Sequence, residues 1–314
     1  MKVITEKDNL EFDRKSVVTV GTFDGVHIGH RQIIEKLNEI KKLRGLRSVL
    51  VTFEPHPRIV LKNHGEVKIL TTLDEKLKIF ESLGIDIVFL ISFTKEFAST
   101  SAEDFYKNYL IEKTGLSELV LGYDHTFGKN REGNFGLLRD LSVKYNFGIH
   151  KIEEYKLGDE HVSSTVIRKA ILSGDVKQAS KLLGSEYILS GKVIQGDRRG
   201  ATLGFPTANL KPDSDYKLIP GNGVYVVTSE IGGKEYYGMM NIGTRPTVEG
   251  STGYHLEVHF FDFDKDIYGE MITVKFIDFI RAEQKFDSLE TLMGQLKKDK
   301  QYTLNITKEI HKIH

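Results

Sequence analysis

The feature that most constrains the fold is a change of sequence rhythm near residue 185. Before it, short apolar runs alternate with longer amphipathic stretches, which is typical of βαβ units and predicts a parallel, doubly wound α/β sheet. The expected strands cover residues 16–20, 49–53, 86–91 and 117–121, and the expected helices cover 29–44, 73–83 and 102–114. The first half therefore predicts an open parallel sheet.

After residue 185 the expected strands are short, alternate apolar with polar residues and are separated by glycines. They cover residues 187–194, 223–231, 235–242, 254–261 and 271–279, and a final helix is expected at 288–310. This spacing is typical of a small antiparallel barrel or sandwich. The chain of 314 residues is long enough for two domains, and we expect them to cover residues 1–185 and 186–314.

Composition excludes several classes of protein. The sequence has no Cys, so a disulfide framework or a thiolate metal site is impossible, and a reducing compartment is expected. No apolar segment approaches the roughly 20 residues that span a bilayer. Lys and Arg number 44 and so do Asp and Glu, which gives no general attraction to nucleic acid. We therefore expect a cytoplasmic protein, a monomer or weak homo-oligomer, without a membrane or nucleic-acid partner.

The first expected strand runs into the sequence G-T-F-D-G-V-H-I-G-H at residues 21–30. Its glycines permit tight turns, and the following helix start offers unpaired N–H groups and a positive dipole end that suit a phosphate. His27 and His30 lie three residues apart, so they share one face of the helix. The dipole disfavours a charge on them until a polyphosphate binds, after which they stabilise charge on the α-phosphate. A lone H-x-x-H is more often a turn with two surface histidines, whereas the whole motif after a strand favours nucleotide transfer.

Three later segments support a nucleotide site in this half. T-F-E-P-H-P-R at 52–58 and L-G-Y-D-H-T-F-G-K-N-R-E-G-N at 121–134 each follow a strand, where open α/β sheets bind ligands. S-S-T-V-I-R at 163–168 opens a helix, and its arginine suits the β and γ phosphates that leave as pyrophosphate. Each segment alone could equally be an ordinary turn or helix cap. The predicted catalytic pair is His27 and His30, and the predicted nucleotide-binding residues are Gly21, Phe23, Asp24, Gly25, His56, Asp124, Ser164, Thr165 and Arg168.

A second cluster begins with G-D-R-R-G-A-T-L-G-F-P-T-A-N at residues 196–209. Thr207 and Asn209 alternate by two, so on an extended segment they point the same way and offer two neutral oxygens suited to Mg²⁺. Glu257, in the alternating strand H-L-E-V-H-F, is the candidate base for a substrate hydroxyl. From the residues alone, T-x-N is more often a strand-edge turn and Glu257 a solvated strand residue. The predicted phosphate-binding residues here are Gly196, Arg198, Arg199, Gly200, Thr207 and Asn209.

These motifs together carry a family resemblance. G-T-F-D-G-V-H-I-G-H, T-F-E-P-H-P, L-G-Y-D-H-T-F-G and S-S-T-V-I-R, in this order, resemble the FMN adenylyltransferase module of bifunctional bacterial riboflavin kinase/FMN adenylyltransferases. P-T-A-N, N-I-G-T-R-P-T-V, E-V-H and D-I-Y-G resemble the riboflavin kinase module, a small Greek-key barrel with a C-terminal helix. The resemblance implies riboflavin, FMN and ATP as substrates. It also implies that Thr207 and Asn209 contact Mg²⁺ and ATP and that Glu257 activates the 5′-hydroxyl of riboflavin.

The sequence departs from the family pattern at three loop positions. Gln195 stands where a histidine is common, Ala201 where a basic residue is common, and Val248 where an aromatic residue is more usual. The first two changes remove possible phosphate contacts at the kinase site, although the neighbouring arginines can compensate. An enzyme that only makes FAD from FMN, with an inactive kinase barrel, is therefore the alternative. A flavin-sensing or RNA-binding protein is a more distant one.

Overall fold

The computed structural model describes residues 1–8, 15–61, 67–123, 135–158, 160–196, 205–246 and 252–313. The chain divides into two compact units, Met1–Ser164 and Thr165–His314. No helix in these ranges is both long and apolar enough to cross a membrane. The predicted domain boundary at residue 185 stays a prediction. Helices α7 (Ser164–Leu172) and α8 (Val176–Leu183) lie between the two division points.

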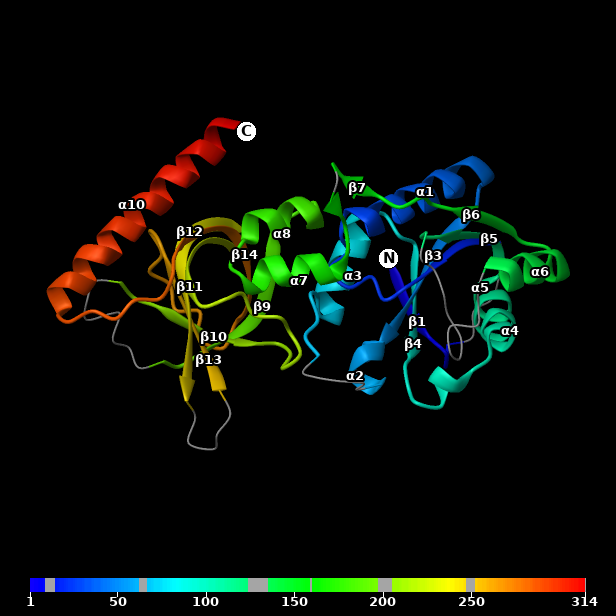
Figure 1. Cartoon of the computed structure of the whole chain (residues 1–314), viewed down its shortest axis with the longest axis horizontal. Helices are drawn as coiled ribbons and strands as arrows, with labels where there is room; N and C mark the ends of the chain where they lie inside the picture. Colours follow the sequence, from blue (N-terminus) through cyan, green and yellow to red (C-terminus); the bar gives the residue numbers. More distant parts are fainter. Residues whose placement is uncertain are drawn as a thin grey trace. The chain divides into compact units, whose positions relative to one another are not determined.

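The first unit contains a six-stranded sheet in which every neighbouring pair of strands is parallel, in the order β1-β4-β3-β2-β5-β6 (Figure 1). The strands are β1 (Lys2–Thr5), β2 (Ser16–Val20), β3 (Arg47–Glu54), β4 (Ile87–Ser92), β5 (Leu116–Leu121) and β6 (Gly148–Lys151). The order runs outward from β2 in both directions, so the topological switch point lies between β2 and β5. The predicted parallel sheet is confirmed.

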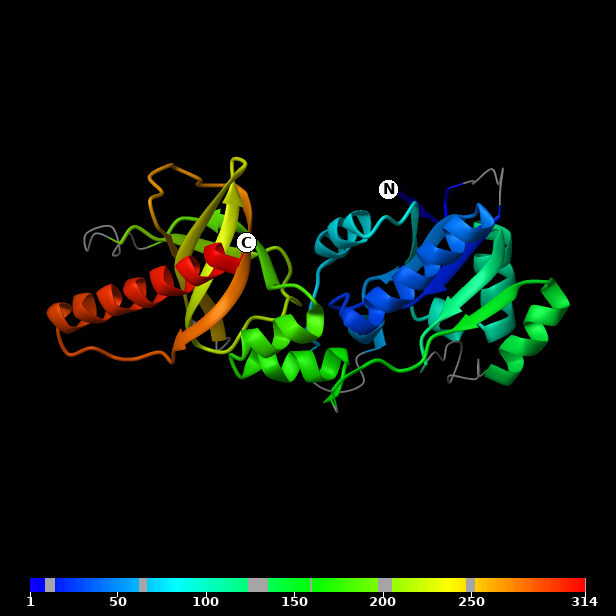
Figure 2. The same ribbon diagram turned by 90° about the horizontal axis from the view of Figure 1, so that it is seen from above.

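Helices cover both faces of this sheet (Figure 2). Because side chains alternate along a strand, Val17 faces one core and Val18 the other. The core around Val17 includes α1 and α3, and the core around Val18 includes α6 and the helical segment that starts with α4. The helices are α1 (Ile28–Arg44), α2 (Pro57–Leu61), α3 (Leu73–Ser82), α4 (Ala102–Phe105), a π-helical segment (Tyr106–Ile111), α5 (Glu112–Thr114) and α6 (Phe135–Tyr145), with a 3₁₀ turn at Phe97–Ser99.

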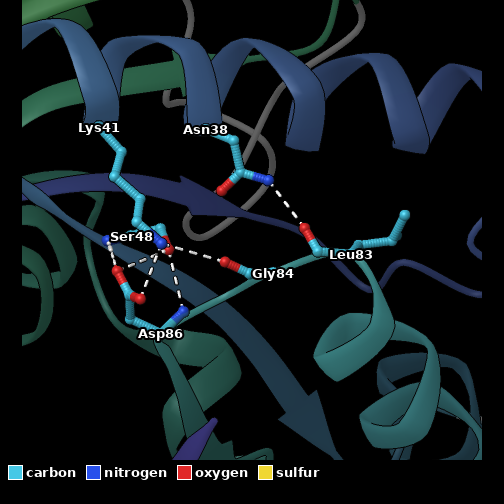
Figure 3. A network of polar contacts seen from close by, with 6 residues as sticks. All are labelled: Asn38, Lys41, Ser48, Leu83, Gly84 and Asp86. Carbon is cyan, nitrogen blue, oxygen red and sulfur yellow. Dashed lines mark hydrogen bonds and ion pairs between the residues drawn. The ribbon is translucent and has the colours of Figure 1, made fainter.

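A polar network fixes the end of α1 that lies away from the strand-end motifs (Figure 3). Lys41 Nζ lies 2.7 Å from Asp86 Oδ1, and the other oxygen of Asp86 accepts the backbone N–H of Ser48 at 2.8 Å. Asn38 donates its side-chain N–H to the carbonyl of Leu83 at 2.8 Å. The C-terminal half of α1 is thus bonded to the turn before β4, and Asp86 in that turn is bonded to the start of β3.

The second unit is a closed antiparallel barrel with the strand order β10-β13-β12-β11-β14-β9 (Figure 1). Its strands are β9 (Tyr187–Ile194), β10 (Ala208–Pro212), β11 (Gly223–Ile231), β12 (Lys234–Pro246), β13 (Thr252–Phe260) and β14 (Met271–Arg281). A short β7 (Lys156–Leu157) and β8 (Glu160–His161) pair separately. Of the two expected architectures, barrel and sandwich, the structure is the barrel.

Two buried carboxylates attach helices to the barrel. Asp299 on α10 (Leu289–Ile313) is 1% exposed and lies 2.9 Å from the guanidinium of Arg281 on β14. Asp278 on β14 lies 2.7 Å from Lys177 of α8 and accepts the hydroxyl of Tyr302 of α10 at 2.8 Å. The C-terminal helix is therefore held to β14 by an ion pair and by a hydrogen bond to a buried carboxylate.

Candidate functional site

The segment that follows β2 forms a turn with an unusual backbone. Phe23, Gly25 and Val26 all have positive φ, at 48°, 86° and 42°. For a β-branched residue such as Val26 this conformation is strained, and such strain is concentrated at functional sites. A Cβ atom on Gly21 would lie 3.1 Å from the Phe23 ring, which explains a small residue there. The turn begins at the carboxyl end of β2, beside the switch point where open α/β sheets bind ligands.

Asp24 shapes this turn from within. Its Oδ1 accepts the backbone N–H groups of Leu70 at 2.8 Å and Thr71 at 3.1 Å, and its side chain is buried. The hydroxyl of Thr71 accepts the N–H of Gly25 at 3.0 Å, and the hydroxyl of Ser164 donates to the Asp24 carbonyl at 3.0 Å. These hydrogen bonds show that Asp24 and Ser164 stabilise the turn.

The two histidines form one stacked unit at the start of α1. His27 is the N-cap residue, and its Nδ1 accepts the backbone N–H of His30 at 3.3 Å. The two rings are 3.6 Å apart and 15° from parallel, and the edge of Phe23 meets His30 with ring centres 5.2 Å apart. The prediction that both histidines share one face of the helix is confirmed. Since Nδ1 of His27 is an acceptor, its proton in the neutral form is on Nε2.

Burial keeps this histidine pair neutral. Burial lowers the pKa of His27 to about 4, against a smaller opposite effect of Asp24. Burial also lowers the pKa of His30 well below its usual value, and the charges of His27 and Lys76 act in the same direction. Within the described ranges, the buried Nδ1 of His30 has no hydrogen-bond partner. The neutral state was predicted from the helix dipole, but desolvation is its main cause.

Lys76 on α3 is a residue of this site that the motifs did not reveal. Its side chain is only 2% exposed, and its Nζ lies 3.4 Å from the carbonyl oxygen of Thr22. Burial lowers its pKa, and the nearby carboxylates of Glu54 and Asp24 raise it. The sequence does contain an indication of this residue. Lys76 is on the apolar stripe of α3, three residues after Leu73 and four before Phe80. A lysine is seldom buried at such a position unless it has a partner or a function.

The other predicted residues of this half lie in different places. His56 is buried at the start of α2, and its Nδ1 accepts the backbone N–H of Arg58 at 3.1 Å. Thr165 and Arg168 are on α7, in the second unit. Asp124 lies outside the described residues. The roles of these residues in nucleotide binding stay predictions.

In the barrel, strand register brings three polar residues into one row. Glu257 on β13 is paired with Asn209 on β10 and with Asn241 on β12. Leu256 and Val258 on either side are 1% exposed and fill the barrel interior, so Glu257 and its cross-strand neighbours face outward. The carboxylate thus lies between two amide side chains. Asn241 was not predicted as a site residue, because register cannot be deduced from one sequence.

Gly196 and His259 pack next to this row of polar residues. A Cβ atom on Gly196 would overlap the side-chain amide of Asn209, so only a glycine fits there without a shift. His259 is two residues beyond Glu257, and its Nδ1 lies 2.8 Å from the carbonyl of Pro206, immediately before Thr207. Burial lowers the pKa of His259, and the Pro206 carbonyl opposes this shift. His259 therefore fixes the segment that carries Thr207.

The amide, hydroxyl and carboxylate oxygens of Asn209, Thr207 and Glu257 are the hard donors that Mg²⁺ prefers. The described residues contain no group of three His, Cys, Asp or Glu side chains that could hold a metal ion. An ion at this row would therefore take most of its ligands from neutral oxygens, phosphate and water. Arg198, Arg199 and Gly200 lie outside the described residues.

Comparisons with known proteins match the two halves of the chain to two different families. The family model described as FAD synthetase matches residues 9–166, and the one described as riboflavin kinase matches residues 183–307. A bifunctional riboflavin kinase/FMN adenylyltransferase of Listeria monocytogenes is 39% identical over 93% of this chain and 92% of its own length. One of Bacillus subtilis is 37% identical over 96% of each chain.

A solved structure with the same fold is described as a macrolide-efflux protein from Streptococcus pneumoniae. It is 34% identical to this chain, with a TM-score of 0.88 over 97% of this chain and 99% of its own. The similarity extends over both units. With two matched family models and relatives that align over more than nine-tenths of its length, the chain belongs to the family of bifunctional riboflavin kinase/FMN adenylyltransferases.

Proposed function

We propose that this chain makes FAD from riboflavin in two steps, each with its own ATP. In the first step the barrel transfers the γ-phosphate to riboflavin and releases ADP. In the second the N-terminal sheet unit transfers AMP to FMN and releases pyrophosphate. The observation that carries the proposal is that each unit holds its own polar constellation, the stacked His27–His30 pair in one and the Asn209–Glu257–Asn241 row in the other.

At the kinase site, Glu257 takes the proton of the riboflavin 5′-hydroxyl as the oxygen attacks the γ-phosphorus. Asn209 and Thr207 would hold Mg²⁺, which would neutralise polyphosphate charge. The backbone at Gly196, close to Asn209, and the arginines at 198 and 199 bind the phosphates. The amides on both sides of Glu257 favour a fixed orientation of its carboxylate.

At the adenylyltransferase site, a phosphate oxygen of FMN attacks the α-phosphorus of ATP, and the bond to the α–β bridging oxygen breaks. His27 and His30 donate hydrogen bonds to the oxygens on which charge develops, from a helix start that favours anions. Lys76 adds positive charge from the neighbouring helix. Arg168 binds the departing β and γ phosphates. No covalent intermediate is needed, because positioning and electrostatics are sufficient for this reaction type.

The test is incubation of the purified chain with riboflavin, ATP and Mg²⁺, followed by chromatographic separation of the flavins over time. We expect FMN to appear first and FAD to follow. Formation of neither flavin would contradict both activities. FAD formed from added FMN, but no FMN formed from riboflavin, would select the alternative with an inactive kinase barrel. A cytoplasmic location and a monomeric or weakly associating state remain predictions.

A further inference from the structure

A histidine lies beside the proposed base of the kinase site. His255 is two residues before Glu257 on β13, so both side chains are on the same outward face of the barrel. Nε2 of His255 lies 2.8 Å from Oε1 of Glu257, and the two side chains are 22% and 27% exposed. The pair is therefore accessible to a substrate and partly shielded from water, where a charge-assisted hydrogen bond has a measurable effect.

The strands on either side of β13 place neutral residues opposite the pair. The cross-strand neighbours of Glu257 on β10 and β12 are asparagines. The neighbour of His255 on β12 is Gly243, and a Cβ atom there would lie 2.6 Å from Oε1 of Glu283. The carboxylate of Glu283 thus lies beside the cross-strand neighbour of His255. His259 is the next residue on the same face of β13, and its Nδ1 is hydrogen-bonded to the carbonyl of Pro206.

We infer that His255 is a positioning residue for Glu257 in the kinase step, holding Oε1 so that Oε2 receives the proton of the substrate hydroxyl. This inference rests on the proposed role of Glu257 as the base. The carboxylate would otherwise rotate about its terminal bond, and each wrong orientation would lower the fraction of productive complexes.

The hydroxyl proton of riboflavin passes to Oε2 of Glu257 while the oxygen forms a bond to the γ-phosphorus of ATP. The bond between that phosphorus and the β–γ bridging oxygen breaks, and its electron pair leaves with ADP. His255 keeps its Nε2 proton throughout, so its contribution is geometric and electrostatic.

Two substitutions test the hydrogen bond between His255 and Glu257. His255→Ala removes it, and His255→Gln keeps a donor near the Nε2 position. A bond of this kind predicts that kcat for FMN formation falls about tenfold or more in the alanine variant, with KM values little changed. Glutamine should restore most of kcat at the pH optimum, because the hydrogen bond to Oε1 is kept.

The split between kcat and KM supplies a readout that a purely structural role would not change. A residue that only orients the base changes the rate of the bound complex, whereas a residue that binds riboflavin changes KM.

His161→Ala is the matched control, because it removes a histidine 2.8 Å from a glutamate, Glu154, in the other unit. It should leave kinase activity unchanged. An alanine variant at 255 with unaltered kcat would overturn the inference, as would a loss seen only in KM that glutamine does not rescue. FMN formation that survives Glu257→Gln would instead contradict the proposed base, so the two failures are distinguishable. The circular dichroism spectrum of each variant, compared with that of the wild type, reports whether the barrel is folded.

Discussion

At the scale of single residues, the site proposed for adenylyl transfer brings two stacked histidines close to a buried lysine. Burial lowers the pKa of both His27 and His30, and Lys76 is buried beside two carboxylates. The histidines could be predicted because they belong to a motif. Lys76 could not be found that way, because its significance comes from a helix that packs against the turn.

The histidine pair predicts how stability depends on pH. The pKa of His27 is lower in the folded chain, at about 4, than its ordinary value of 6.5, so the unfolded chain binds more protons between these values. The free energy of unfolding of the first unit should therefore decrease as pH falls through this window, by about 3 kcal/mol for His27. Thermal unfolding of the wild type and of a His27→Asn, His30→Asn double variant measures the difference. Asparagine keeps the N-cap. A double variant with the same pH dependence as the wild type would contradict the assignment.

We expect Lys76→Met to lower FAD formation without lowering FMN formation. Removal of a buried cation beside the turn should lower the rate of FAD formation from FMN by about a hundredfold, as for other preorganised groups at phosphate sites. FMN formation from riboflavin should be unchanged. Lys36→Met, at an exposed lysine paired with Glu39 on α1, is the control. Equal FAD formation in both variants would show that Lys76 has only a packing role.

At the scale of elements, the strands with strong patterns were predicted well. β2, β9 and β11 have the predicted bounds; α1 begins one residue earlier than predicted, and α10 begins one residue later and ends three residues later. The four-residue edge strands β1 and β6 were missed, because a half-exposed edge leaves little apolar pattern. The predicted helix at 102–114 contains a π-helical segment that its periodicity did not indicate. The Asn209–Glu257–Asn241 row depends on register between strands far apart in sequence, which no local pattern specifies.

The ion pair that attaches α10 to the barrel predicts that one substitution lowers the stability of the barrel unit. Asp299→Asn leaves the mostly buried guanidinium of Arg281 without its carboxylate, which should lower the free energy of unfolding of the barrel unit by about 3 kcal/mol. Glu290→Gln makes the same chemical change at an exposed position of the same helix and should have little effect. Denaturant unfolding followed by circular dichroism compares the two. Equal midpoints for the two variants would show that the ion pair contributes nothing to stability.

At the scale of the whole molecule, the chain joins two units with separate cores and separate polar sites. We propose that the sheet unit binds its substrates at the carboxyl ends of its strands and that the barrel binds them on an outward face. The sequence motifs named candidate residues for each site, and the roles of these residues stay predictions. The motifs did not indicate the neighbours of these candidates, such as Asn241, His255 and Lys76, because those contacts form only when distant segments pack.

The central claim, two independent sites acting in series, is tested most directly by mixing two defective variants. Given riboflavin, ATP and Mg²⁺, Glu257→Gln alone should form no FMN, and His30→Ala alone should accumulate FMN without FAD. Each variant should keep the activity that the other has lost. An equimolar mixture should then form FAD, because the FMN made by one chain is adenylylated by the other. FAD formation by His30→Ala alone, or no FAD in the mixture of two folded variants, would contradict the account.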